Sequence, residues 1–342
     1  MSTRGIFHVV LVFVLAAAAG ALRAEPGDFV YARPGALLDA GTTRLNFYCM
    51  GTGSPTVVFD AGFSDWSPAW VKVQPRVAQW TRACSYDRAG SGFSEAAVLP
   101  RTGTRIADEL HAALRNGGIP GPYILVGSAY GGNIARTFAQ RHRGETAGLV
   151  LVDADATDRE PKALQDDDHR SHRDIPIFFR ACRDAVLAGR PLEISAPAGS
   201  PPDRCDTSFF RGLPERTWSP ELNEKVMELT RSKAAMYDAI ASEMEEVPRG
   251  EAYLQEHEGS LGSRPVRVLT SGHHGGGPRG GTSTPEGRRY QDEVTKAQAS
   301  WLRLSSNSKQ LFARESPDEY IQLEQPDLVV QAIREVYDAG RP

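Results

Sequence analysis

The stretch from Tyr123 to Gly132, with the sequence YILVGSAYGG, constrains the fold of this chain more than any other segment. Its first four residues are apolar or β-favouring and predict a short buried strand. Closely spaced glycines follow, and residues 133–139 then predict a helix. So sharp a turn strains the backbone of its central residue, Ala129, and glycines are needed because side chains two positions away would clash with it. The pattern therefore predicts a strand, a glycine turn and a helix around Ala129.

The composition of the chain is that of a globular protein. It has 342 residues, of which 40% are hydrophobic and 24% are charged. This length can hold two domains, but an α/β fold of this size is often one domain with an insertion. The net charge of −4 gives no indication of nucleic acid or an anionic membrane as a partner, and we expect neither.

Residues 1–24 predict a cleavable signal peptide. Arg4 supplies a positive charge, residues 6–22 are almost continuously apolar, and Ala24 offers a small residue at the cut. The alternative is a membrane anchor, because about 17 apolar residues are the lower limit for spanning a bilayer. The run of alanines is typical of a cleavable segment. We therefore expect a mature chain of residues 25–342 that is secreted or periplasmic and has no stable membrane anchor after cleavage.

The chain contains four cysteines, at positions Cys49, Cys84, Cys182 and Cys205. Four cysteines allow three pairings. In an oxidising compartment the simplest scheme pairs each cysteine with its nearer neighbour, Cys49 with Cys84 and Cys182 with Cys205. Free buried thiols are the alternative. No Cys-x-x-Cys spacing occurs, so we expect no zinc site, and we expect no other metal and no cofactor.

Elsewhere the sequence predicts an alternation of strands and helices, which is typical of an α/β fold. Apolar and β-branched runs predict the strands at residues 44–49, 56–60, 83–86, 148–153, 265–270 and 310–313. Apolar residues at helical spacing predict the helices at residues 66–80, 105–115, 174–187, 221–246 and 326–337.

Four motifs follow one another in a characteristic order: Asp60-Ala61-Gly62, then YDRAGSG at 86–92, GSAYGG at 127–132 and GLVLVD at 148–153. Together with residues 321–330, they resemble the secreted bacterial branch of the α/β-hydrolase superfamily. The resemblance covers nearly all of residues 25–342 except an insertion at about 157–262. It implies an α/β-hydrolase fold, in which helices flank a mostly parallel central sheet and the insertion forms a helical cap.

The resemblance also implies roles for individual residues. In this fold two backbone N–H groups form an oxyanion hole, and Phe63 and Tyr130 are at the matching positions. The catalytic groups follow in the order Ser, acid, His. Here the nucleophile position is Ala129, and Glu319 stands where the His is expected. The acid is left open between Asp153 and Asp155.

The absence of both the nucleophile and the base is the pattern expected of a hydrolase descendant that no longer needs the triad. Whether the chain is an enzyme stays open. We expect a catalytically impaired or non-catalytic homologue, a pseudoenzyme, that binds a small or medium apolar molecule under the cap. One alternative is a rearranged hydrolase of esters or related acyl compounds, with His273 or His274 as base and water as nucleophile. The other pairs the carboxylates of Glu319 and Asp153 as acid and base.

Overall fold

The computed structural model describes residues 27–156, 162–194, 203–207, 209–210, 218–272, 281–314 and 320–340. The predicted signal peptide, residues 1–24, lies outside the described residues and stays a prediction.

An eight-stranded sheet forms the centre of the fold. Its strands lie in the order β1-β2-β4-β3-β5-β6-β9-β10. β2 runs antiparallel to both of its neighbours, and the remaining pairs are parallel. The bounds are β1 (Ala36–Asp39), β2 (Arg44–Met50), β3 (Thr56–Asp60), β4 (Ala83–Tyr86), β5 (Tyr123–Ser128), β6 (Thr146–Val152), β9 (Val266–Ser271) and β10 (Ser308–Ala313).

Helices cover both faces of this sheet, because the central strands are apolar on both sides. Val57 and Phe59 on β3 pack into one core, which includes residues of α11, while Val58 between them packs into a second core with α2 and α3. The flanking helices are α1 (Gln74–Val77), α2 (Gly103–Asn116), α3 (Tyr130–Arg141), α9 (Pro285–Ala299), α10 (Ile321–Glu324) and α11 (Pro326–Ala339). Short 3-10 helices are η1 (Asp28–Ala32), η2 (Ser67–Trp70), η3 (Arg143–Glu145), η7 (Gly281–Ser283) and η8 (Ser300–Leu304).

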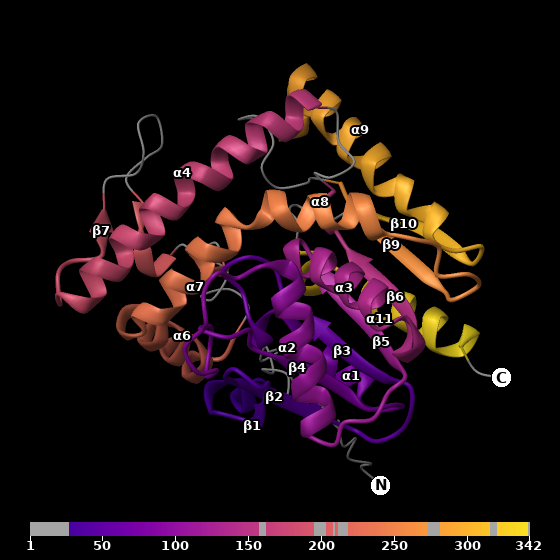
Figure 1. The fold of residues 1–342 in the computed structure, drawn as a ribbon, viewed down its shortest axis with the longest axis horizontal. Coiled ribbons are helices and arrows are strands. Elements are labelled where there is room, and N and C mark those ends of the chain that lie inside the picture. Colours follow the sequence, from indigo (N-terminus) through magenta and orange to yellow (C-terminus); the bar gives the residue numbers. More distant parts are fainter. Residues whose placement is uncertain are drawn as a thin grey trace, which may run out of the picture.

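A helical insertion separates β6 from β9 in the sequence. It consists of α4 (Lys162–Leu187), β7 (Glu193–Ile194), β8 (Asp203–Arg204), η5 (Cys205–Thr207), α6 (Pro220–Ser232), α7 (Ala234–Glu245) and α8 (Val247–His257). α4 and α7 lie side by side away from the sheet, while α8 contacts α2 and α3 (Figure 1). The predicted fold, a mostly parallel sheet flanked by helices with a helical cap insertion, is confirmed.

Two predicted helices differ from the observed ones. Residues 66–80 form η2 and α1 rather than one helix, and a proline lies in the first turn of each, where its missing N–H is tolerated. Residues 221–246 divide into α6 and α7 at Lys233, whose backbone is not helical. The Lys233 ammonium donates to the carbonyl oxygens of Ser91 (3.4 Å) and Gly92 (2.7 Å), so a distant loop fixes the break. The strands and α-helices without a predicted counterpart are β1, β7, β8, α8, α9 and α10.

Both predicted disulfides are confirmed. Cys49 and Cys84 are direct partners across the antiparallel β2–β4 ladder. Cys182 of α4 is bonded to Cys205 of η5, which ties two parts of the helical insertion together.

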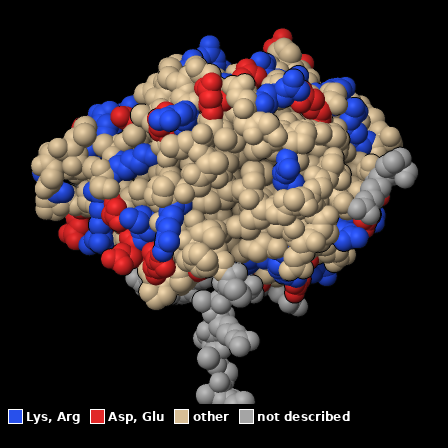
Figure 2. Space-filling model, turned by 90° about the horizontal axis from the view of Figure 1, so that it is seen from below, with Lys and Arg blue, Asp and Glu red and all other residues tan. Residues whose placement is uncertain are grey.

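Charged side chains of both signs are mixed around the margin of the face shown in Figure 2, and a broad central area of that face carries few charges. Within the described part of the chain, none of the helices is both long and apolar enough to traverse a bilayer.

Candidate active site

The turn between β5 and α3 is built around Ala129. The backbone of this residue has φ 45° and ψ −124°, a conformation that residues other than glycine rarely adopt. Its carbonyl oxygen accepts hydrogen bonds from the backbone N–H groups of Gly132 (2.9 Å) and Asp155 (3.2 Å). The predicted strand–turn–helix unit is thus formed, with its strained centre occupied by alanine.

The glycines of this turn are required by close backbone contacts. A Cβ on Gly127 would lie 2.2 Å from the carbonyl oxygen of Gly131. One on Gly131 would lie 2.5 Å from the carbonyl oxygen of Ala61, and one on Gly132 would lie 2.2 Å from the Cβ of Ala154. The turn between β5 and α3, which we call the elbow, is therefore tightly packed, and its Gly131 lies against the turn after β3.

The predicted oxyanion residues lie next to each other. The rings of Phe63 and Tyr130 stack with their centroids 4.0 Å apart and an interplanar angle of 12°. Tyr130 is the first residue of α3, where backbone N–H groups have no acceptor within the helix. A Cβ built on Gly62 would lie 3.3 Å from the Cβ of Ala129, so the two turns meet at the elbow. That the two N–H groups converge on one point stays a prediction.

A carboxylate that was not among the predicted site residues lies next to Gly62, in the turn that adjoins the elbow. Asp65 is only 5% exposed, and its Oδ2 lies 3.5 Å from the same Cβ position on Gly62. Its Oδ1 accepts hydrogen bonds from the backbone N–H of Phe210 (3.2 Å) and the hydroxyl of Tyr320 (3.3 Å). Asp65 could have been predicted from the sequence by its position three residues after Gly62, in the turn already assigned to the oxyanion hole.

Aromatic side chains of the helical insertion cover this turn. Trp66 makes edge-on contacts with Phe209 and Phe210, at centroid distances of 6.0 and 4.4 Å. Phe210 in turn packs against Trp218 at 4.6 Å. The insertion therefore places apolar rings against Trp66, the residue that follows Asp65.

The two candidate acids occupy different surroundings. Asp153, at the end of β6, is fully buried and accepts hydrogen bonds from the N–H and hydroxyl of Ser271 (3.2 and 2.7 Å) and from Nε2 of Gln298 (3.0 Å). Its carboxylate thus links β6, β9 and α9. Asp155 is half-buried, and its backbone N–H donates a hydrogen bond to the Ala129 carbonyl oxygen. The choice between them stays open.

Three other predicted site residues, Glu319, His273 and His274, lie outside the described residues, so their assigned roles stay predictions. Within the described part of the chain, no group of three or more His, Cys, Asp or Glu side chains is placed to hold a metal ion.

A buried guanidinium joins the turn after β3 to the helical insertion. Arg88 is 3% exposed, and its Nη1 donates to Asp60 Oδ1 (2.6 Å) and to the Ala61 carbonyl oxygen (2.7 Å). Its Nη2 donates to the Gly62 carbonyl oxygen (2.5 Å), and its Nε donates to Glu243 Oε1 on α7 (3.2 Å). The orientation of peptide groups 61 and 62 is therefore set by one side chain.

Burial shifts the pKa values of two side chains that contact Arg88, Asp60 and Tyr130. Burial raises the pKa of Asp60 to about 6, against the opposing effects of Arg88 and the Tyr86 hydroxyl. Burial also raises the pKa of the Tyr130 phenol far above its usual value, so this side chain stays neutral. The Arg88 guanidinium lies 5.5 Å from the centre of the Tyr130 ring and completes the contact between the turn and the elbow.

Comparison with known proteins agrees with this geometry. Residues 55–181 match the family model described as alpha/beta hydrolase fold. A segment is 30% identical over 103 residues to the uncharacterized protein YqjL of Bacillus subtilis (30% of this chain, 41% of that protein). Another is 31% identical over 104 residues to an AB hydrolase superfamily protein of Gibberella zeae (29% of this chain, 32% of that protein). The chain therefore spans less than half the length of these curated relatives.

Solved structures share the fold over most of the chain. A thermophilic esterase from Thermogutta terrifontis superposes with a TM-score of 0.60 at 21% identity, covering 91% of this chain and all (100%) of that one. An epoxide hydrolase from Bacillus megaterium superposes with a TM-score of 0.62 at 13% identity, covering 88% and 99%. The chain therefore has an α/β-hydrolase fold.

The glycine contacts generate a test of the elbow. We expect Gly127→Ala to lower the free energy of unfolding by about 2 kcal/mol or more, because the added Cβ collides with backbone. The matched control is Gly144→Ala, since nothing lies within 4 Å of a Cβ there, and it should change stability by less than about 0.5 kcal/mol. Chemical denaturation of both variants makes the comparison, and equal effects would contradict the tight turn.

The Arg88 contacts generate a second test. Glu243→Gln keeps an acceptor for Arg88 but removes a buried counter-charge, so we expect it to lower the free energy of unfolding by about 1–3 kcal/mol. Glu245→Gln, on the same helix, changes a carboxylate with 42% side-chain exposure that pairs with Arg180, and should cost less than about 1 kcal/mol. If the two variants unfold at the same denaturant concentration, Glu243 does not hold the insertion to the turn.

Proposed function

We propose that this chain is a secreted α/β-hydrolase-fold protein with little or no hydrolytic turnover, which binds a small or medium apolar molecule through a carbonyl oxygen at the elbow. The observation that carries the proposal is the strained backbone of Ala129, at φ 45°, in a turn whose central residue has no hydroxyl. Strained residues persist where the surrounding structure determines them and are common at functional sites. The retained function would be the binding of an oxygen by backbone N–H groups.

A neutral carbonyl fits this site better than a carboxylate. Asp65 is buried next to Gly62, which adjoins Ala129, and an ionised Asp65 would repel a second negative charge in a site of low dielectric. The aromatic side chains Trp66, Phe209 and Phe210 provide apolar surface next to it. An ester, amide or ketone with an apolar body is therefore the ligand class that we infer.

The neighbouring serine does not replace the missing nucleophile in this proposal. Ser128 is 3% exposed, and its hydroxyl has no hydrogen-bond partner among the described residues. A serine hydroxyl is a weak nucleophile unless a base takes its proton.

Secretion is supported by the apolar N-terminal segment and by two disulfides, which persist in oxidising compartments.

The decisive experiment restores the missing nucleophile and base, first singly and then together. We expect no robust hydrolysis of short and medium acyl p-nitrophenyl esters by the unaltered mature chain or by Ala129→Ser. A carboxylate at Glu319, with an ordinary pKa of about 4.3, is a poor proton acceptor at pH 7. Ala129→Ser with Glu319→His supplies nucleophile and base together, so the gain should appear mainly in the double variant. Glu319→His alone is the matched control.

The result that would overturn the proposal is robust turnover by the unaltered chain that is abolished by His273→Ala or His274→Ala. That outcome would favour the rearranged hydrolase. A second form of this alternative rests on Asp65, a buried carboxylate beside the elbow. Turnover by the unaltered chain that is lost in Asp65→Asn would assign the chemistry to that side chain.

The inferred preference for a neutral ligand generates a separate prediction. Asp65→Asn replaces the carboxyl group next to Gly62 by a neutral amide. Binding of phenylacetate should therefore tighten at least about fivefold relative to binding of its methyl ester. Asp292→Asn makes the same charge change at an exposed position of α9 and should leave the ratio unchanged. Calorimetric titration of both ligands measures the ratio. An unchanged ratio in Asp65→Asn would contradict the assigned ligand class.

A further inference from the structure

We propose that the Cys49–Cys84 disulfide is an exchangeable bond and that Cys49 is a modification site for a small organic thiol, held as a mixed disulfide in an adjacent cavity. This site lies at the β1–β2 edge of the sheet, with β4 and β3 between it and the elbow strand β5. The proposal does not depend on the function proposed above.

A cavity of about 450 Å³ opens beside the disulfide. Cys49 itself forms part of its wall, together with Ala36 and Leu38 of β1, Phe47 and Met50 of β2, and Ile119. A space of this size accommodates a small organic molecule. A disulfide-bonded cysteine therefore forms part of the wall of a space that can hold a ligand.

The exposure of the four cysteines distinguishes the two disulfides. Cys49 is exposed, whereas Cys84 is completely buried (0% exposed). Cys182 and Cys205 are both completely buried as well. Because thiol–disulfide exchange requires access of the attacking thiolate to one sulfur, Cys49 is the favoured point of attack.

The exchange step is balanced without any added oxidant. A thiolate, R–S⁻, attacks Sγ of Cys49 and forms a new S–S bond while the Cys49–Cys84 bond breaks. The electron pair leaves on Sγ of Cys84, which then takes up a proton. Attack by the Cys84 thiolate on the mixed disulfide reverses the step and releases R–S⁻.

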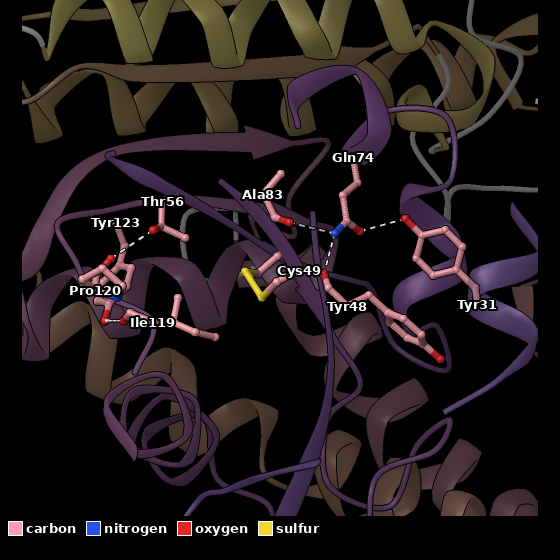
Figure 3. The surroundings of a disulfide bond; sticks show 10 residues. Tyr31, Tyr48, Cys49, Thr56, Gln74, Ala83, Ile119, Pro120 and Tyr123 are labelled. Atoms are coloured by element: carbon pink, nitrogen blue, oxygen red, sulfur yellow. Dashed lines mark hydrogen bonds between the residues drawn. A yellow bond between two sulfur atoms is a disulfide. The ribbon is translucent and has the colours of Figure 1, made fainter. Parts of the chain in front are cut away.

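A side chain holds the two strands together independently of the disulfide. Gln74 is fully buried, and its Nε2 donates to the carbonyl oxygens of Tyr48 (2.5 Å) and Ala83 (3.0 Å), the residues directly before Cys49 and Cys84 (Figure 3). Its Oε1 accepts a hydrogen bond from the Tyr31 hydroxyl (2.8 Å). The strands thus have a bridge that survives breakage of the S–S bond, so Cys84 stays opposite Cys49 and can close the bond again.

The lining of the cavity indicates the class of thiol. Leu38, Phe47, Met50 and Ile119 are apolar, and the described residues of the wall include no charged side chain. An uncharged thiol with an apolar body is therefore favoured over a charged one such as glutathione, because burying unpaired charges is costly.

The first experiment incubates the oxidised mature chain with phenylmethanethiol or glutathione at equal thiolate concentration and maps the adducts by non-reducing mass spectrometry. We expect the adduct on Cys49, formed on the order of tenfold faster than any at Cys182 or Cys205, and faster with phenylmethanethiol. Ala36→Trp narrows the cavity and should slow the reaction. Leu37→Trp, the adjacent exposed position outside the cavity wall, should not. Equal labelling of all cysteines, or first labelling at Cys182 or Cys205, would overturn the proposal.

A second experiment tests the role of Gln74 by amide hydrogen exchange before and after reduction. In the unaltered chain, exchange at residues 47–50 and 83–86 should stay slow when the disulfide opens. In Gln74→Met it should accelerate on reduction, because the backbone ladder alone then holds β2 to β4. Each variant is compared with its own oxidised form, so a general loss of stability is separated from the effect of reduction. Fast exchange in the reduced unaltered chain would contradict a reversible site.

Discussion

The buried guanidinium of Arg88 is the contact on which the geometry of the site depends. Removing a charge from water costs several kcal/mol unless hydrogen bonds and counter-charges compensate. Arg88 finds Asp60, the carbonyl oxygens of Ala61 and Gly62, and Glu243, which come from the end of β3, the following turn and α7. One desolvated side chain therefore fixes the turn beside the elbow and the helical insertion at the same time.

The elbow keeps its shape around an alanine because backbone contacts hold it. The strain at Ala129 is held by backbone hydrogen bonds from Gly132 and Asp155 and by the absence of Cβ atoms at Gly127 and Gly131. None of these contacts involves a nucleophile. The backbone of the site is thus maintained by hydrogen bonds and close packing, and it persists when the side chain that the fold usually places there is absent.

The helical insertion determines the chemical character of the site. The ring of Phe210, a residue of the insertion, packs against Trp66. The backbone N–H of Phe210 donates a hydrogen bond to the buried carboxylate of Asp65. The result is a buried carboxyl group close to apolar rings, from which we infer a neutral carbonyl ligand. The second disulfide, Cys182–Cys205, fastens the part of the insertion from which these rings come.

The sequence by itself determined the strand–turn–helix unit, most strands of the sheet and both disulfide pairings. These follow from short-range patterns: β-branched runs, glycines where a Cβ would collide, and an even number of cysteines. Tertiary structure alone decided the break at Lys233, the contact of Asp65 with Phe210, and the bond from Arg88 to Glu243. Those partners are separated by more than a hundred residues, 145 for Asp65 and Phe210 and 155 for Arg88 and Glu243. Local sequence patterns do not predict such pairs, because the partners of a buried charge come together only when distant segments of the chain pack against each other.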